Sequence, residues 1–322
     1  MLCPVCQKET RKFGKNRNGS QRHRCDECRK TFTDEATRPA DGRELSQEKA
    51  IMVLRMLLEG ASVRSTERLT GVHRDTILNT LVDSGKACAR FLDEKVRNVP
   101  AQDVQADEIW SFVNCKEKTR VAKNYPEWVG DSWCFVALDR DSKLVLTWHN
   151  DRRTPEATRT FLQKLRKATS GRFQLSTDGF RPYRTATWDT FGNDIDFAQL
   201  VKVYGTTADA GPQARYSPGV VIGAEQLICI GNPDEELICT SHAERQNLTM
   251  RMTLRRLTRL TNAHSKKGLN HWCALALYFA FYNFCRDHDT LHKAAKAKTT
   301  PAMAAGLTDH VWSVGELLAN AV

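Results

Sequence analysis

Three acidic residues lie at positions in this sequence where metal-dependent chemistry could be carried out. Asp107 lies within "VQADEIWSFV", Asp178 ends "FQLSTD", and Glu244 comes near the start of "SHAERQNLTMRMTLRRLTRL". Three converging carboxylates repel one another unless cations neutralise them, and Mg²⁺ favours carboxylate and phosphate oxygens. We therefore predict that these residues are catalytic and bind two Mg²⁺ (or Mn²⁺) ions, an arrangement suited to phosphodiester chemistry. Each acid taken alone is more often a surface charge, so the prediction depends on their joint placement.

The pattern of apolar residues from position 104 onward indicates how these acids could meet. It predicts helices at 154–169, near 184–191 and at 241–260, and strands at 104–113, at two runs within 133–150, at 173–180 and at 196–205. Three antiparallel strands followed by alternating helix and strand is the order of a ribonuclease H-like α/β fold. We expect such a catalytic domain over 102–290, with a mixed five-stranded sheet. In that fold the middle of the first strand lies beside the end of the fourth, and a later helix crosses there.

The segment that carries Glu244 is strongly basic. Residues 241–267 hold seven Lys or Arg residues against one acid. Helical spacing would place Asn247, Arg251 and Arg255 on one face with Glu244, where they could hold phosphates. The alternative is a surface helix whose apolar residues face the core, and the two interpretations are compatible. His242 could touch substrate or be structural. The residues of this segment that we predict to bind DNA are Arg245, Asn247, Arg251 and Arg255.

Four cysteines near the N-terminus have the spacing of a zinc site. "CPVC" supplies Cys3 and Cys6, and "CDEC" supplies Cys25 and Cys28. Each pair can place two thiolates on one side of an ion, so two pairs complete a tetrahedral shell. Redox-active pairs and chance pairing are the alternatives, but neither explains the paired spacing. We predict a zinc ribbon at 1–35 with one structural Zn²⁺ that supplies its folding energy.

The next segment has the pattern of a helix-turn-helix DNA-binding domain over 45–98. "LSQEKAIMVLRMLLEG" has helical apolar spacing, and "SVRSTERLTGVHRDTILNTL" reads as a short helix, a turn and a second helix. A further helix is expected at 83–97. A generic three-helix bundle is the alternative. Small polar and basic side chains near the start of the second helix suit a major groove, and those predicted to contact DNA are His73, Arg74, Thr76 and Asn79.

Composition limits the partners that this chain could have. The 322 residues carry a net charge of +10, which favours a polyanion, nucleic acid first. The longest apolar run, 272–284, is too short to span a bilayer, so we expect a buried helix there and no membrane partner. "MLCPVCQKET" does not resemble a signal peptide, and eleven cysteines without one argue against a disulfide framework. We expect a cytoplasmic, nucleoid-associated protein.

At "STDGFRPY" and "SHAERQNLTMRMTLRRLTRLT" the sequence resembles the DDE transposases of bacterial insertion sequences, in particular the insertion-sequence-one family. Members pair a zinc ribbon and a helix-turn-helix with a ribonuclease H-like core, and the similarity spans nearly the whole chain. The matching positions include "ADEIW" for the first aspartate, "TDGF" for the second and "HAERQN" for the glutamate. The segment 206–240 departs from the pattern as an insertion with two short strand candidates around "GNPDEE", and 291–322 is expected to form a C-terminal helical tail.

The resemblance implies a transposase that binds the terminal repeats of its element, cleaves there and joins the freed 3′ end to target DNA. Two DNA ends must be handled together, so a homodimer or larger assembly is expected. One alternative is a DNA-binding regulator or domesticated transposase that is catalytically silent. The other is a ribonuclease H-like nuclease, although such enzymes do not usually need the two N-terminal modules.

Overall fold

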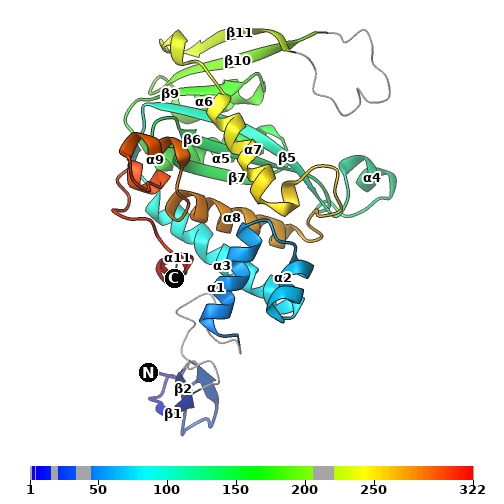
Figure 1. Cartoon of the computed structure of the whole chain (residues 1–322), viewed down its shortest axis with the longest axis vertical. Coiled ribbons are helices and arrows are strands. Elements are labelled where there is room, and N and C mark those ends of the chain that lie inside the picture. The colour runs from blue at the N-terminus through cyan, green and yellow to red at the C-terminus, as the bar shows by residue number, and fades with distance from the viewer. Residues whose placement is uncertain (1, 4, 16–20, 34–44, 206–220, 322) are drawn as a thin grey trace.

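The computed structural model describes residues 2–3, 5–15, 21–33, 45–205 and 221–321 (Figure 1). Residues 34–44 and the first part of the predicted insertion, 206–220, lie outside the described residues. Among the helices that are described, none has the combination of length and apolar character needed to cross a membrane.

The N-terminal segment forms a small antiparallel sheet that brings the four predicted zinc ligands together. Its strands are β1 (Arg11–Lys15), β2 (Gln21–Arg24) and β3 (Thr31–Thr33), in the order β1-β2-β3. Few apolar side chains are available here, and the buried cysteines Cys3 and Cys25 are the centre of the segment. The arrangement fits a zinc ribbon.

Three helices follow. They are α1 (Gln47–Leu58), α2 (Val63–Thr70) and α3 (Arg74–Lys95). Ser46 and Ser62 cap the first two helices by accepting backbone N–H groups, and Gly71 ends α2 in the left-handed conformation at φ 68°. The turn between α2 and α3 therefore lies where the sequence predicts it. The separate helix expected at 83–97 is wrong, because α3 runs unbroken for 22 residues.

The uninterrupted path of α3 results from its packing on α8 (Gly268–Phe284). The run "DSGK" looks like a helix boundary because glycine weakens a helix interior. In the structure, however, Gly85 allows the two helices to approach closely: a Cβ there would lie 2.4 Å from the carbonyl oxygen of Cys273. Burial of the helix against α8 thus outweighs the local propensity of this stretch.

The central sheet is mixed and has six strands, so the expectation of five is corrected. Its order is β11-β10-β9-β5-β6-β7. Strands β5, β6 and β7 are antiparallel neighbours, β5, β9 and β10 run parallel, and β11 adds antiparallel to β10. The strands are β5 (Asp103–Val113), β6 (Gly130–Asp139), β7 (Val145–Asp151), β9 (Gln174–Asp178), β10 (Asp196–Tyr204) and β11 (Val221–Ile230). A mixed sheet covered by helices is compatible with a ribonuclease H-like core.

The extra strand, β11, comes from the predicted insertion and lies at the sheet edge with nearly every residue exposed. It ends at Ile230, just before "GNPDEE", so it confirms the first of the two strand candidates expected around that stretch. The second candidate, after "GNPDEE", is wrong, because a short 3-10 turn at Glu235–Leu237 and residues outside any strand occupy its place.

Helices cover both faces of the sheet. Alternate residues of β5 point to opposite faces, and their contacts identify the helices: Ser111 bonds His271 of α8, whereas Glu108 faces Tyr183 of α6 (Pro182–Phe191). Helix α5 (Pro155–Ala168) packs with α6, and α7 (Ser241–Thr253) crosses β5 on the side of α8 (Figure 1). The remaining elements are β4 (Val99–Pro100) paired with β8 (Thr169–Ser170), α4 (Glu117–Ala122), α9 (Asp289–Ala295), α10 (Pro301–Ala304) and α11 (Val314–Asn320).

The basic helix expected at 241–260 ends early, at Thr253. Leu254 has extended backbone angles, and a short 3-10 turn at Arg255–Leu257 follows. Leu254 and Leu257 are both buried, as Met250 is. Because α7 ends at Thr253, Arg255 does not share a helix face with Glu244.

Candidate active site

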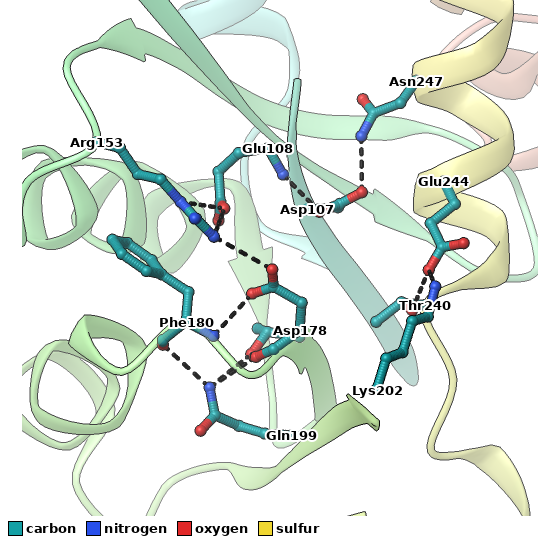
Figure 2. A network of polar contacts seen from close by, with 11 residues as sticks. Asp107, Glu108, Arg153, Asp178, Phe180, Gln199, Lys202, Thr240, Glu244 and Asn247 are labelled. Carbon is teal, nitrogen blue, oxygen red and sulfur yellow. Dashed lines mark hydrogen bonds and ion pairs between the residues drawn. The ribbon is translucent and has the colours of Figure 1, made fainter. Parts of the chain in front are cut away.

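The carboxylates of Asp107, Asp178 and Glu244 line one cavity of about 690 Å³. They come from the middle of β5, the last residue of β9 and the first turn of α7. The parallel pairing of β5 with β9 ends at Ala106 and Thr177, so the next residue of each strand, an aspartate in both cases, lies at the open end of this ladder. Figure 2 shows the three acids around this space.

Asp107 is held at both carboxylate oxygens. The backbone N–H of Glu108 donates to Oδ1 at 2.8 Å, and the side-chain amide of Asn247 donates to Oδ2 at 2.8 Å. Burial, followed by the negative charges of Asp178 and Glu244, raises the pKa of Asp107 to about 6. Repulsion from these like charges makes Asp107 harder to ionise, and a bound cation would reduce the repulsion.

Asp178 is fixed by the turn that follows its strand. Its Oδ1 accepts the backbone N–H of Phe180 at 3.0 Å, and Arg153 lies 3.2 Å from Oδ2. The side-chain amide of Gln199 donates to the backbone carbonyls of Asp178 and Phe180, at 2.7 and 3.1 Å. This cross-link between β10 and the turn determines where the carboxylate points (Figure 2).

Glu244 lies on the other side of the cavity and has its own partners. Thr240 donates its hydroxyl to Oε1 at 2.7 Å, and Lys202 forms an ion pair with the same oxygen. Glu244 is outside the tighter group formed by Asp107, Glu108 and Asp178, whose nearest carboxylate oxygens all lie within 4.8 Å of one another. That group could hold a divalent metal ion.

Glu108 is the acid that sequence reasoning missed. It is buried on the opposite face of β5, where Arg153 pairs with it at 2.8 Å and Tyr183 lies against it. Burial, followed by the charge of Asp178, raises its pKa to about 8. Adjacent strand residues normally point apart, so the dipeptide "DE" did not indicate a pair. The oxygens of the three acids meet because Asp178 lies just beyond the last pair of the β5–β9 ladder, next to Asp107 and Glu108.

Arg153 and Lys202 place positive charge within the cavity lining. Arg153 contacts both Glu108 and Asp178, and it comes just before the N-cap of α5, Thr154. Lys202 extends from β10 to Glu244. An Arg before a helix and a Lys in a strand carry no sequence signal of a site, since only the sheet order brings Arg153 and Lys202 to the cavity.

Two of the side chains predicted to bind DNA on the basic segment make contacts within the protein. Asn247 is buried with its amide on Asp107. Arg251 is half-buried and donates to the carbonyls of Leu257 and Trp110, at 3.2 and 3.5 Å. Burial lowers the pKa of Arg251 to about 10.

The other two residues of that segment lie elsewhere. Arg245 is exposed on α7, and Arg255 lines a separate cavity of about 590 Å³ together with Arg74 of α3. His242 is not among the residues that line the carboxylate cavity. Its backbone N–H bonds Gln105 at 2.9 Å and its ring lies 3.5 Å from Lys143.

The predicted DNA-contact residues of the helix-turn-helix lie at the start of α3. His73 is its N-cap and accepts the backbone N–H of Asp75 through Nδ1 at 3.3 Å. His73, Arg74 and Asn79 are exposed, and Thr76 is half-buried. The first three are accessible to a partner.

The four N-terminal cysteines form a compact cluster whose sulfurs lie within 4.8 Å of one another. Cys3 and Cys28 are separated by 3.6 Å and Cys6 and Cys25 by 3.4 Å. A tetrahedral Zn²⁺ with Zn–S bonds of about 2.3 Å separates its sulfurs by about 3.8 Å, so the cluster fits zinc closely. The backbone N–H of Val5 points to Cys3 Sγ at 3.4 Å, as expected beside a thiolate. All eleven cysteines are free.

No family model matches the chain. Among solved structures it is similar to the piggyBac transposase synaptic complex with hairpin DNA, at 9% identity and a TM-score of 0.34, over 82% of this chain and 71% of that one. It is also similar to Marinitoga piezophila Argonaute in complex with 5′ OH guide RNA, at 11% identity and a TM-score of 0.20, over 66% and 36% of the two chains. Similarities this weak assign neither a family nor an activity to this chain.

Proposed function

We propose that this protein is a DNA transposase of the DDE type, which binds the terminal repeats of a mobile element, cleaves the DNA there and joins the ends to target DNA. The observation that carries the proposal is that Asp107, Asp178 and Glu244, from three separate segments, line one cavity. The all-oxygen donor set and the raised pKa of Asp107 suit divalent cations. The chemistry that a bound pair of Mg²⁺ or Mn²⁺ ions supplies is activation of a water or 3′-hydroxyl and stabilisation of the leaving oxygen.

The residues around the acids then have distinct roles. Asn247 holds Asp107 in one orientation, and the Phe180 N–H and Gln199 do the same for Asp178. Lys202 and Arg153 supply the positive charge that a phosphate backbone needs next to three carboxylates. These contacts fix the acids before DNA arrives.

Recognition of the element ends is assigned to the N-terminal modules. The zinc-bound ribbon and the exposed start of α3 would contact the terminal repeats. Arg245 and Arg255 would contact the DNA backbone. The net charge of +10 supports a polyanionic partner. Because two ends must be joined in one event, the active form is proposed to be a dimer or larger assembly.

A strand-transfer assay tests the proposal. Labelled duplexes from the DNA flanking the gene are incubated with full-length protein, Mg²⁺ and a circular target plasmid. Joining of label to plasmid is expected for the wild type and is expected to be undetectable for Asp178→Asn, with duplex binding retained. Asp189→Asn is the matched control, because Asp189 pairs with Arg159 outside the cavity lining.

The assay also separates the alternatives. Cleavage without joining would identify a nuclease, and specific binding without either would identify a silent regulator. Strand transfer by Asp178→Asn at the wild-type rate would refute the site.

A further inference from the structure

A row of aromatic and cationic side chains extends from the carboxylate cavity across one face of the sheet. It begins where the guanidinium carbon of Arg153 lies 3.9 Å from the ring centre of Phe180 and 4.9 Å from that of Trp133. The same Arg153 contacts Asp178, so the row starts at the site itself. Its six members, in spatial order, are Phe180, Arg153, Trp133, Trp110, Phe112 and Lys116.

The far part of the row is built on β5 and β6. Trp133 and Trp110 are direct cross-strand partners, so both rings lie on the face that carries Glu108. The rings of Trp110 and Phe112 have centres 5.6 Å apart, and the Lys116 ammonium lies 5.7 Å from the centre of Trp110. The three rings of Trp133, Trp110 and Phe112 thus have a cation beside them at two points, Arg153 next to Trp133 and Lys116 next to Trp110.

The row is accessible, and its electrostatic surroundings favour an anion. The four rings are only half-buried, and Lys116 is exposed. Glu117, next to Lys116, is neutralised by ion pairs with Arg120 and Arg152, at 2.6 and 2.8 Å, and these partners lower its pKa to about 2. Large, partly open rings beside cationic side chains suit bases and phosphates. Of the two cations, Lys116 is exposed, and Arg153 also pairs with Glu108 and Asp178.

We propose that this row is a binding track for unpaired DNA, with bases stacked on Trp133, Trp110 and Phe112 and phosphates held by Arg153 and Lys116. Exposed aromatic rings interleaved with cations bind single strands because every base has a face to stack, whereas the faces of paired bases in a duplex are already covered. The inference rests on the proposed function for the identity of the strand: the one that is unpaired next to the bond to be cut.

Binding without Mg²⁺ or Mn²⁺ tests this track separately from cleavage. Full-length protein that keeps its zinc, in buffer free of Mg²⁺, Mn²⁺ and chelators, is titrated into a labelled oligothymidylate of about twelve nucleotides, and into a duplex of mixed sequence, with fluorescence anisotropy as the readout. Trp110→Leu and Trp133→Leu keep apolar volume but remove the stacking ring. Each is expected to weaken single-strand binding about tenfold and duplex binding less than about twofold. Trp110→Phe, which keeps a ring, is expected to restore most of the affinity.

Trp188→Leu is the matched control, because Trp188 is an exposed tryptophan of α6 outside the row. A readout on the unmodified protein avoids any effect of substitution on folding: photocrosslinking to an oligonucleotide that contains 5-iododeoxyuridine is expected to label peptides from β5 and β6. Equal losses for duplex and single strand, unchanged binding by both leucine variants, or crosslinks confined to other segments would overturn the proposal.

The two proposals can fail independently. If the wild type binds the oligothymidylate through these rings but joins no element end to a plasmid, the track stands and the transposase assignment falls. If strand transfer occurs and the leucine variants bind single strands normally, the transposase assignment stands and the proposed track is refuted.

Discussion

Asn247 of α7 and Asp107 of β5 are joined by a hydrogen bond of 2.8 Å from the side-chain amide to the carboxylate. They are 140 residues apart in the chain, and the bond anchors the crossing helix to the middle of the sheet. Because the other oxygen of Asp107 accepts the N–H of Glu108, both oxygens are oriented before any ligand binds. Hydrogen bonds to the charged form also oppose the effect of burial on the pKa of Asp107.

Asn247→Leu is therefore expected to impair chemistry rather than DNA binding. Leucine has a similar volume but donates no hydrogen bond, so Asp107 loses its orientation and is harder to ionise. Residues that orient metal ligands typically contribute about 10- to 100-fold in metal affinity or activity. Mg²⁺ titrations of strand cleavage should show a loss of this size with unchanged duplex affinity. Asn320→Leu, at an exposed position of α11, should behave as the wild type; a parallel fall in duplex binding would contradict the assignment.

His271 predicts a pH dependence of stability. It is buried between Ser111 and Ser265, at 3.1 and 3.0 Å, and burial lowers its pKa from 6.5 to about 3. The unfolded chain binds this proton and the folded chain does not, so stability is present above about pH 6.5 and is lost as the pH falls toward 3. The wild type should lose about 1.4 kcal/mol more than His271→Gln for each pH unit between 6 and 5, measured by urea unfolding.

His310 provides the control for this measurement. It is exposed, and Asp309 and Glu316 raise its pKa, so any stability that it contributes is present at low pH and lost as the pH rises. His310→Gln should leave the acid-side slope of the wild type unchanged. A slope for His271→Gln equal to that of the wild type would show that His271 is not held neutral in the fold.

Gly85→Ala should destabilise the protein despite the helical preference of alanine. The added Cβ would lie within 2.6 Å of three atoms of Cys273, so α3 and α8 must move apart. Such overpacking costs about 1–3 kcal/mol, against a gain of about 1 kcal/mol in helix propensity. Urea unfolding measures the difference. Gly268→Ala is the matched control, since no atom lies within 4 Å of a Cβ there, and an equal response of the two variants would refute close packing at Gly85.

Loss of the metal from the cysteine cluster should unfold the N-terminal sheet. We expect one zinc per chain by elemental analysis, and Cys25→Ser should lose it because three thiolates hold Zn²⁺ less tightly than four. Limited proteolysis should then cut within β1–β3 and leave the central sheet intact. Cys229→Ser, at a cysteine outside the cluster, should retain zinc, and zinc retained by Cys25→Ser would count against the cluster as the binding site.

The order of strands and helices along the chain could be predicted because each element has a local pattern of apolar, turn and cap residues. The boundaries of β5 and α5 fall within a residue or two of those expected, and Asp107 and Asp178 lie at the end of one parallel ladder, where the strand order places them. Turn and cap residues such as Gly71 and Thr154 act over a few positions, so the sequence displays them directly.

The features of the fold and the site that could not be predicted depend on contacts between residues far apart in the sequence, which leave no local pattern. Gln199 fixes the turn after Asp178 across 21 positions, and Lys202 reaches Glu244 across 42. The end of α7 at Thr253 leaves no local signal, because Met250, Leu254 and Leu257 keep the spacing of one continued helix face. In the sequence alone, Asn247 is indistinguishable from a polar surface residue of a helix. Only the fold shows that its side chain contacts Asp107.

Under the proposed function, the continuity of α3 would determine where DNA is cut. Its exposed start carries the predicted DNA contacts, and its body packs on α8, which lies against the central sheet. A helix of 22 residues is about 33 Å long, close to one turn of duplex. If α3 binds a specific DNA sequence, this rigid helix acts as a molecular ruler. The distance between the bound sequence and the cleaved bond is then a constant number of base pairs.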